Sequence, residues 1–262
     1  MGRLLDFCAK IGAAIAVYLR GAGRLAIFAA AAVSHIARPP IYWKEIGRQM
    51  VSIGYYSLPV VAMTMLFSGM VLALQSYMGF SRVNAESSVA FVVVLSITRE
   101  LGPVLAALMV AGRIGASMAA EIGTMAVSEQ IDALTTLATN PFKYLITPRI
   151  IAGTLMMPLL VLVGDIIGIY GGYLVGIHKL GFAASTYLKN TWDFMQAMDV
   201  LSGLVKAAVF GFVISLMGCA SGYYCRSGAQ GVGRATTNAV VSSSVLVLIA
   251  NYIITELFFA RG

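Results

Sequence analysis

The feature of this sequence that most constrains its fold is a set of long apolar runs that contain almost no charge. From Gln49 to Ser81 there is no charged residue, and a helix needs only about 20 apolar residues to cross a bilayer. Charged residues make up 11% of the chain, whereas a soluble domain carries roughly 25%. The runs are also continuous, unlike the ~10-residue alternating segments of an outer-membrane barrel. We therefore expect an all-α polytopic membrane protein.

Five segments are long and apolar enough to span the membrane. They are residues 49–81, 87–112, 150–177, 200–225 and 235–255. Charged residues interrupt three of them: Arg99 and Glu100 in the second, Asp165 in the third, and Lys206 in the fourth. We assign all five spans to one domain over residues 41–262.

The distribution of basic residues predicts the orientation, because cytoplasmic loops are enriched in Lys and Arg. With the N-terminus inside, twelve basic residues lie inside and four outside. The inside set is Arg3, Lys10, Arg20, Arg24, Arg38, Lys44, Arg48, Arg113, Lys143, Arg149, Arg226 and Arg234, and the outside set is Arg82, Lys179, Lys189 and Arg261. The net charge of +7 therefore suits anionic headgroups rather than nucleic acid. We expect a cytoplasmic N-terminus and an external C-terminus.

Residues 1–40 form a separate amphipathic segment. Its charges fall within about 100° of one helix face at 100° per residue; they are Arg3, Asp6, Lys10, Arg20 and Arg24. Such a helix lies in the membrane interface, and Pro39-Pro40 ends it. The alternative is a cleaved signal peptide with Ala29-Ala30-Ala31 as the cleavage site, although two arginines within the apolar part argue against it.

Recognisable catalytic and metal-binding motifs are missing from the sequence. There is no G-x-x-x-x-G-K-[ST] phosphate loop, so we do not expect this chain to hydrolyse ATP in the usual way. There is no H-E-x-x-H or G-x-S-x-G motif, and the two histidines are far apart. Cys8, Cys219 and Cys225 are interpreted as small apolar residues without a disulfide or zinc role. We expect no enzyme activity, no metal and no cofactor in this chain.

The inside segment between the second and third spans is predicted to contain an ordered helix. Residues 128–137 are amphipathic, with Ser128 as N-cap and acidic residues in the first turns, and Asn140-Pro141 ends them. An acidic amphipathic helix on the inside face suits docking of a soluble partner. A helix lying on the lipid surface is the alternative.

Charges within the spans are costly and need partners. Arg99 and Glu100 point about 100° apart on a helix, so Glu100 with Lys206 is the natural pair between helices. This pair is either structural or part of a site for a charged headgroup, because a phosphodiester needs a cation and a hydrogen-bond donor. Asp165 is expected to contact only neighbouring backbone, and Asp199, at a span end, to be solvated.

Proline and glycine residues predict where the spans bend and pack. Pro103 removes the helical hydrogen-bond donor of the Arg99 carbonyl and is expected to bend the second span there, beside the charges; a packing role is the alternative. Glycines at every fourth position of the third span build a smooth face for another helix, of this chain or of a dimer mate: Gly164, Gly168, Gly172 and Gly176.

Several blocks of sequence form an unusual pattern around the second span and the inside segment. They are Arg99–Leu108 (RELGPVLAAL), Ala111–Ala116 (AGRIGA), Ala120–Met125 (AEIGTM) and Glu129–Leu134 (EQIDAL), with Gly69–Gln75 (GMVLALQ) and Arg234–Thr237 (RATT) elsewhere. Together they resemble the MlaE (YrbE-type) family of ABC transporter permeases over nearly the whole chain. The departures lie in the outside loops.

The resemblance implies a homodimeric permease of a Gram-negative inner-membrane system that moves phospholipids between the inner and outer membranes and maintains outer-membrane lipid asymmetry. It implies a cytoplasmic MlaF-type ATPase that binds ATP and magnesium, an MlaB-type STAS-domain protein and a periplasmic MlaD-type MCE ring. It also implies that residues 121–134 are the coupling helix, with contacts to the ATPase from Glu121, Ile122, Gly123, Met125, Glu129, Gln130, Asp132 and Leu134.

Lipid tails need an apolar and adaptable lining, which methionine provides. With the charged groups, the expected substrate path is Met70, Leu74, Gln75, Tyr77, Arg99, Glu100 and Lys206. The alternative for the first-span residues is plain lipid-facing or core surface. The alternative function is an ion-coupled secondary transporter that uses the Glu100 and Lys206 charges, although no inverted repeat supports it.

Overall fold

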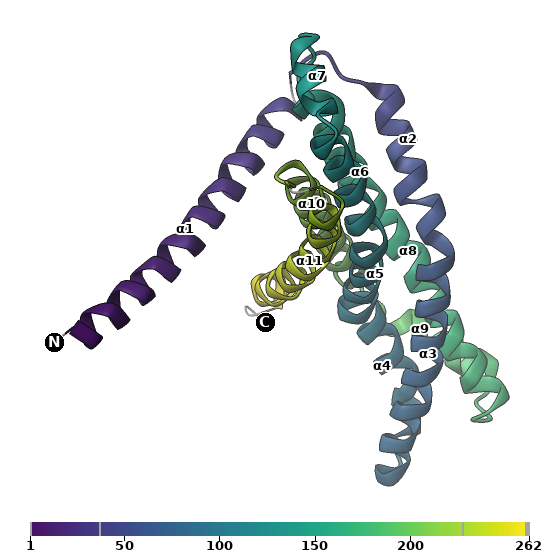
Figure 1. Ribbon diagram of the computed structural model, residues 1–262. Helices are drawn as coiled ribbons and strands as arrows, with labels where there is room; N and C mark the ends of the chain where they lie inside the picture. The colour runs from purple at the N-terminus through teal and green to yellow at the C-terminus, as the bar shows by residue number, and fades with distance from the viewer. Residues whose placement is uncertain (1, 37, 227, 260–262) are drawn as a thin grey trace.

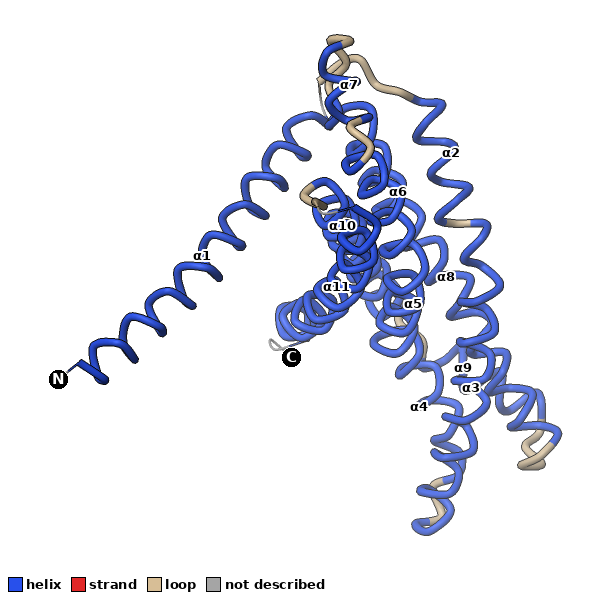
Figure 2. Tube along the Cα trace, viewed as in Figure 1, coloured by secondary structure: helices blue, strands red, loops and turns tan. Residues whose placement is uncertain are grey.

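The computed structural model describes residues 2–36, 38–226 and 228–259, which are helical almost throughout and contain no strand (Figures 1 and 2). Within these described residues, five stretches of helix are long and apolar enough to cross a membrane. Their bounds are Trp43–Phe80, Glu86–Val127, Phe142–His178, Ala197–Tyr223 and Gly228–Phe258. The predicted fold class is therefore confirmed, while the orientation across the bilayer stays a prediction.

Each span is built from one or more helical elements. The first consists of α2 (Trp43–Ile53), η1 (Tyr55–Ser57) and α3 (Leu58–Phe80). The second consists of η3 (Glu86–Ser88), α4 (Val89–Ser96), the π-helical η4 (Ile97–Leu101), α5 (Gly102–Val110), the π-helical η5 (Ala111–Gly115) and α6 (Ala116–Val127). The third consists of the π-helical η6 (Phe142–Ile146) and α8 (Thr147–His178), the fourth of α10 (Ala197–Tyr223) and the fifth of α11 (Gly228–Phe259).

The helix of the second span continues well beyond Gly112, where the uncharged sequence ends. Arg113 does not interrupt it, because its guanidinium donates hydrogen bonds to the Ser52 carbonyl (3.3 Å) and to Ser57 Oγ (2.8 Å) at the start of the first span. Beyond Arg113, α6 buries Met118 and Ile122 in the bundle. The second span is thus one continuous helical rod from Glu86 to Val127 and includes the first part of the inside segment.

The glycine stripe of the third span packs against helices of the same chain. Gly164 and Gly168 lie against α3, and Gly172 lies against both α3 and α4. Gly69 of α3 approaches the Gly168 carbonyl so closely that a side chain at position 69 would overlap it. Packing within the chain, one of the two predicted alternatives, is therefore confirmed.

Helix α1 (Gly2–Ile36) is joined to the bundle only near its C-terminal end and otherwise stands apart (Figure 1). Phe28 and Ala32 are buried, and the Phe28 ring packs on Phe142, Tyr223 and Tyr224 with ring centroids 5.2–5.8 Å apart. A helix over this segment, ending before the prolines, is confirmed. Its position in the membrane interface stays a prediction, and the side chains of Arg3, Asp6, Cys8 and Lys10 lie outside the described residues.

A short helix between the third and fourth spans, α9 (Ala184–Phe194), was not anticipated from the sequence. It packs Tyr187 and Thr191, one turn apart, on α4 and α8. The Tyr187 ring fills the space left by Gly172 and Gly176, and burial raises the pKa of its hydroxyl to about 12. In the sequence, the i, i+4 spacing of Tyr187 and Thr191 indicates this helix.

The close contact between α3 and α8 predicts a strong effect of a single methyl group. We expect Gly69→Ala to destabilise the fold by about 1–3 kcal/mol, because the new Cβ overlaps the Gly168 carbonyl. Gly79→Ala is the matched control, since a Cβ there meets nothing within 4 Å and alanine favours the helix. Thermal unfolding of the purified chain in detergent measures both; equal midpoints for the two variants would contradict the packing described.

Candidate functional site

The second span changes its helical geometry where its two charges lie. Ile97–Leu101 is π-helical, and the Gly102 N–H bonds to the Ile97 carbonyl. Pro103 cannot donate to the Arg99 carbonyl, and this carbonyl instead accepts a hydrogen bond from Lys206 Nζ at 2.8 Å. The predicted loss of the helical donor at Arg99 is therefore confirmed, and the fourth span supplies the replacement.

Glu100 is held by three side chains from two other spans. Its Oε1 accepts from Lys206 Nζ at 2.7 Å and from Thr255 Oγ1 at 2.9 Å, and its Oε2 accepts from Asn251 Nδ2 at 2.9 Å. The predicted pair with Lys206 is confirmed. Lys206 is fully buried, whereas the Glu100 side chain keeps 37% of its exposure. A ligand beside this cluster would therefore meet Glu100 rather than Lys206.

Arg99 forms a second ion pair with the same helix of the fourth span. Both its Nε and one terminal nitrogen lie 2.6 Å from Asp199 Oδ1. The prediction that Asp199 is solvated was wrong: this residue is fully buried. It lies at the third position of α10, where Oδ2 also accepts the Gln196 N–H in a capping box, so the carboxylate faces the bundle and is compensated there.

The four charges form two neutral pairs on one face of α10. Asp199 and Lys206 are seven residues apart, which is two helical turns, and they receive the two adjacent charges of the second span separately. About one third of the Arg99 side chain is exposed, like that of Glu100. The cluster thus presents one partly exposed cation and one partly exposed anion, each backed by a buried counter-ion.

A groove lies between the first and second spans, and its second-span lining begins at Leu101, the residue that follows the two charges along the chain. Its volume is about 480 Å³, and it is lined by Phe67, Ser68, Val71, Leu72, Gln75, Leu101 and Leu105. Of the first-span residues expected in the substrate path, Gln75 lies in this groove, whereas Met70, Leu74 and Tyr77 are partly buried outside its lining. Tyr77 packs on Phe182. In the sequence, the i, i+4, i+8 spacing of Phe67, Val71 and Gln75 already indicates one helix face. The structure shows that these three side chains are exposed.

A fifth charged residue, Asp165 of α8, lies within the spans. It is buried, and among the described residues its Oδ1 has no hydrogen-bond partner. The carboxylate lies directly against Gly102, at the end of the π-helical turn that carries Arg99 and Glu100. The expectation of contact with neighbouring backbone fits this position.

The residues expected to contact an ATPase are divided between two helices. Helix α6 ends at Val127, and α7 spans Gln130–Thr136. Ser128 is not the N-cap of α7 as predicted: its hydroxyl donates to the Thr124 carbonyl and closes α6, while Glu129 begins α7 with a left-handed φ of 59°. The segment is therefore a bent pair of helices rather than one rod.

Only part of this segment is available to a partner. Ile122 and Gly123 are buried in the bundle, and Met125 and Leu134 are partly buried. The exposed members of the expected set are Glu121, Glu129, Gln130 and Asp132. Leu137, just after α7, is 75% exposed and was missed. The available surface is acidic and also exposes the apolar side chains of Val127 and Leu137.

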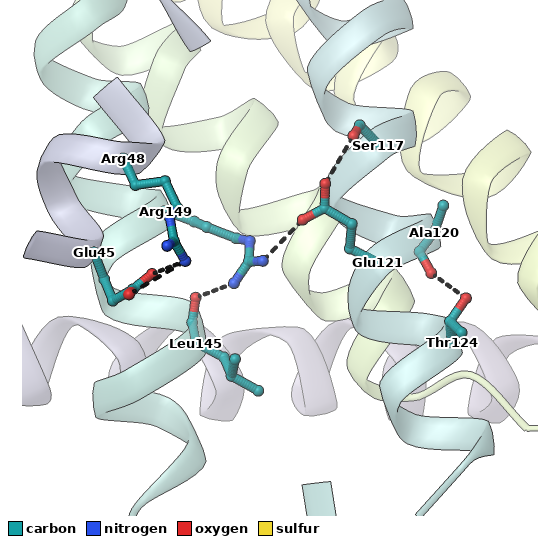
Figure 3. Close-up of polar contacts among 8 residues, drawn as sticks. All are labelled: Glu45, Arg48, Ser117, Ala120, Glu121, Thr124, Leu145 and Arg149. Carbon is teal, nitrogen blue, oxygen red and sulfur yellow. Dashed lines mark hydrogen bonds and ion pairs between the residues drawn. The ribbon is translucent and has the colours of Figure 1, made fainter. Parts of the chain in front are cut away.

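An ion pair fastens this segment to the third span (Figure 3). Arg149 of α8 donates to Glu121 Oε2 at 2.9 Å and to the Leu145 carbonyl at 2.8 Å. Ser117 donates to the other oxygen of Glu121 at 3.2 Å. Arg149 is buried, although the sequence suggested only an inside loop charge. Movement of α6 would therefore be transmitted to α8 through this pair.

Comparison with known proteins agrees with this architecture. The family model described as Permease MlaE matches residues 46–257. A probable ABC transporter permease protein of Rickettsia bellii is 62% identical over 98% of this chain and 99% of its own length. The intermembrane phospholipid transport system permease protein MlaE of Haemophilus influenzae is 35% identical over 99% of this chain and 100% of its own. The chloroplast protein TRIGALACTOSYLDIACYLGLYCEROL 1 of Arabidopsis thaliana is 37% identical over 89% of this chain and 67% of its own.

The fold and the comparisons together define a multi-pass helical membrane protein, the permease subunit of an ABC transporter. The chain belongs to the MlaE permease family.

The contact between Asp165 and Gly102 predicts a coupled pair of mutations. We expect Gly102→Ala to destabilise the fold by about 1–3 kcal/mol, since its Cβ would overlap the Asp165 carboxylate. Asp165→Ala alone removes a buried unpaired group and is expected to be neutral or stabilising. The double variant should recover part of the loss, with a coupling energy of about 0.5–3 kcal/mol. Unfolding in detergent is measured for the wild type, the two single variants and the double variant. If the two single changes in unfolding free energy simply add in the double variant, the contact is not formed.

Proposed function

We propose that this chain is the membrane subunit of an ATP-driven transporter that moves phospholipids between the inner and outer membranes of a Gram-negative bacterium and so maintains outer-membrane lipid asymmetry. The observation that carries the proposal is that one turn of the second span holds both the partly exposed Arg99 and Glu100 and Leu101, which lines an apolar groove. A phospholipid has both apolar tails and a charged headgroup, and this arrangement offers surfaces for both. The membership in the MlaE family supports it.

The proposed machine contains further subunits. We propose that the chain works as a homodimer in the inner membrane, with an MlaF-type cytoplasmic ATPase that binds ATP and magnesium, an MlaB-type STAS-domain protein and an MlaD-type periplasmic MCE ring. An ABC permease needs an ATPase partner, and the name of the Haemophilus relative refers to a phospholipid transport system. This chain supplies the membrane passage rather than the hydrolysis.

The continuous helical rod of the second span suggests how work reaches the site. Its α6 end carries the acidic surface beside α7, and its middle carries Arg99 and Glu100. A displacement of α7 by the ATPase would move α6, and Arg149 would carry the movement to α8 through Glu121. The ion pairs with α10 would then change their spacing and open or close the groove.

An ion-coupled secondary transporter is the second candidate. The observation that favours it is the set of titratable groups within the membrane, Glu100, Lys206 and Asp165. An ion-coupled mechanism gives no role to the exposed acidic surface of α7. Transport by the full complex that persists without ATP but stops when the ion gradient collapses would favour this candidate over ours.

Charge reversal on α7 tests the coupling surface. We expect the double variant Glu129→Arg with Asp132→Arg to lower co-purification of the ATPase by about tenfold or more, because two reversed charges oppose a complementary surface. The matched control, Glu86→Arg with Asp193→Arg, reverses two exposed acids outside α7. Affinity purification after mild solubilisation measures the effect. Wild-type recovery of the ATPase with the α7 variant would exclude this docking surface.

Substitution of the Glu100–Lys206 pair distinguishes a structural ion pair from a headgroup site. Lys206→Ala leaves Glu100 without its buried cation, and such losses cost about 3–5 kcal/mol. The neutral double variant Glu100→Gln with Lys206→Gln keeps a donor to the Arg99 carbonyl and an acceptor for Asn251 and Thr255. It should therefore keep the assembled complex, yet its lipid transport should fall at least about tenfold below wild type, because the charge offered to the headgroup is lost. Transfer of labelled phospholipid by the complex in proteoliposomes measures it; wild-type transport by the neutral variant would make the pair purely structural.

A further inference from the structure

A second cavity lies where α1 joins the bundle, far from the charged cluster. Its volume is about 670 Å³, and it lies between α1, the C-terminal end of α10 and the start of α11. From Lys206 to Ser221, which lines it, α10 advances 15 residues, or about 22 Å at 1.5 Å per residue. Its lining is Gly21, Ala22, Arg24, Leu25, Met217, Ala220, Ser221, Tyr224, Cys225, Arg226, Gly231, Arg234, Ala235 and Asn238.

The charges in this lining are all positive. Arg24, Arg226 and Arg234 come from three different parts of the chain, and no acidic residue accompanies them. Within residues 2–36, 38–226 and 228–259, none of the three forms an ion pair with a carboxylate. All three are exposed, whereas the arginines inside the bundle have partners within the chain. Arg99 pairs with Asp199, Arg149 pairs with Glu121, and Arg113 donates to Ser52 and Ser57.

The rest of the lining is mainly apolar and is provided by fixed elements. Leu25, Met217, Ala220 and Ala235 supply hydrocarbon surface, while Ser221, Tyr224 and Asn238 supply hydrogen-bonding groups. The floor is tightly built, because Gly231 lies against the Arg226 carbonyl with no room for a side chain. The cavity thus combines an arginine-rich polar part with an apolar wall.

Helix α1 forms one side of the cavity in a defined position. Arg24 is one turn before Phe28, which is buried and packs on the aromatic rings of η6 and α10. Asn140 hydrogen-bonds to His35 in the last turn of α1 (3.2 Å), and Lys143 donates to the Pro39 carbonyl in the linker after it (2.7 Å). The contacts that hold α1 against the bundle therefore also bring Arg24 to the cavity.

We propose that this cavity binds one anionic phospholipid of the surrounding membrane. The phosphodiester would lie among Arg24, Arg226 and Arg234, since guanidinium groups bind phosphate oxygens in a bidentate manner, and one acyl chain would lie along Leu25, Met217, Ala220 and Ala235. Such a lipid joins α1 to α10 and α11. The site is separate from the groove beside Glu100, and the proposal stands whether or not that groove carries the transported lipid.

Photo-crosslinking tests the proposal with the full chain in lipid nanodiscs. We use a photoactivatable phosphatidylglycerol as the anionic probe, a matched phosphatidylethanolamine as the zwitterionic probe, and peptide mass spectrometry to locate the adducts. We expect phosphatidylglycerol adducts on residues 217–226 and 231–238, in excess over phosphatidylethanolamine. Adducts on residues 97–105 report the other groove and serve as an internal reference.

Two kinds of variant separate the charge from the shape of the site. Arg226→Gln with Arg234→Gln should lower the adducts at this cavity by about tenfold, whereas Arg82→Gln with Lys189→Gln removes the same charge elsewhere and should not. Ala22→Trp should fill the cavity without a change of charge and also lower the adducts, whereas Ala30→Trp, on the same helix but outside the lining, should not.

Three results would overturn the proposal. Unchanged adducts in the Arg226 and Arg234 variant would show that these arginines do not hold the lipid. Equal labelling by both probes, or displacement of the probe by inorganic phosphate, would show that the site does not select an anionic lipid. Labelling of residues 97–105 without adducts on residues 217–226 and 231–238 would show that no lipid enters this cavity.

Discussion

The compensation of charge inside an apolar bundle is the constraint on which the rest of this structure depends. Lys206 is fully buried, and an uncompensated ammonium at bilayer depth costs several kcal/mol. Its Nζ donates hydrogen bonds to Glu100 and to the Arg99 carbonyl, and Asp199 compensates Arg99 two turns away. These contacts fix the register of α10 against the second span, because a shift of one residue would separate both pairs at once.

The compensation requires the second span to depart from regular α-helical geometry. Because of the π-helical turn and the missing N–H of Pro103, the Arg99 carbonyl is free to accept a hydrogen bond from Lys206. In a regular helix this carbonyl would bond within the helix instead. Irregular backbone at membrane depth is tolerated where it is enclosed by protein or lines a cavity. The cluster thus has few alternative arrangements, and a change in the tilt of the rod must stretch one pair relative to the other.

Much of this fold follows from the sequence, because hydropathy and bilayer thickness fix the number and length of the spans. The Glu100–Lys206 pair was also predictable, since opposite charges on different spans have few other partners. Asp199 and Arg149 were not, because their burial depends on how far the helices continue past the apolar runs. Likewise, the path residues Met70 and Leu74 share a helix face that turns partly into the bundle, while Phe67, Val71 and Gln75 face the groove.

The same constraint explains why the arginines at the junction of α1 differ from those in the bundle. Arg99 and Arg149 lie against packed helices, so each requires a carboxylate from the chain itself. Arg24, Arg226 and Arg234 are exposed around a cavity, where solvent weakens their mutual repulsion and an anion between them would offset it. Because α1 touches the bundle only near its C-terminal end (Figure 1), an anion bound there would both relieve that repulsion and strengthen the attachment of α1. Charge compensation by the chain would thus stabilise the interior, and compensation by the membrane would stabilise the junction with α1.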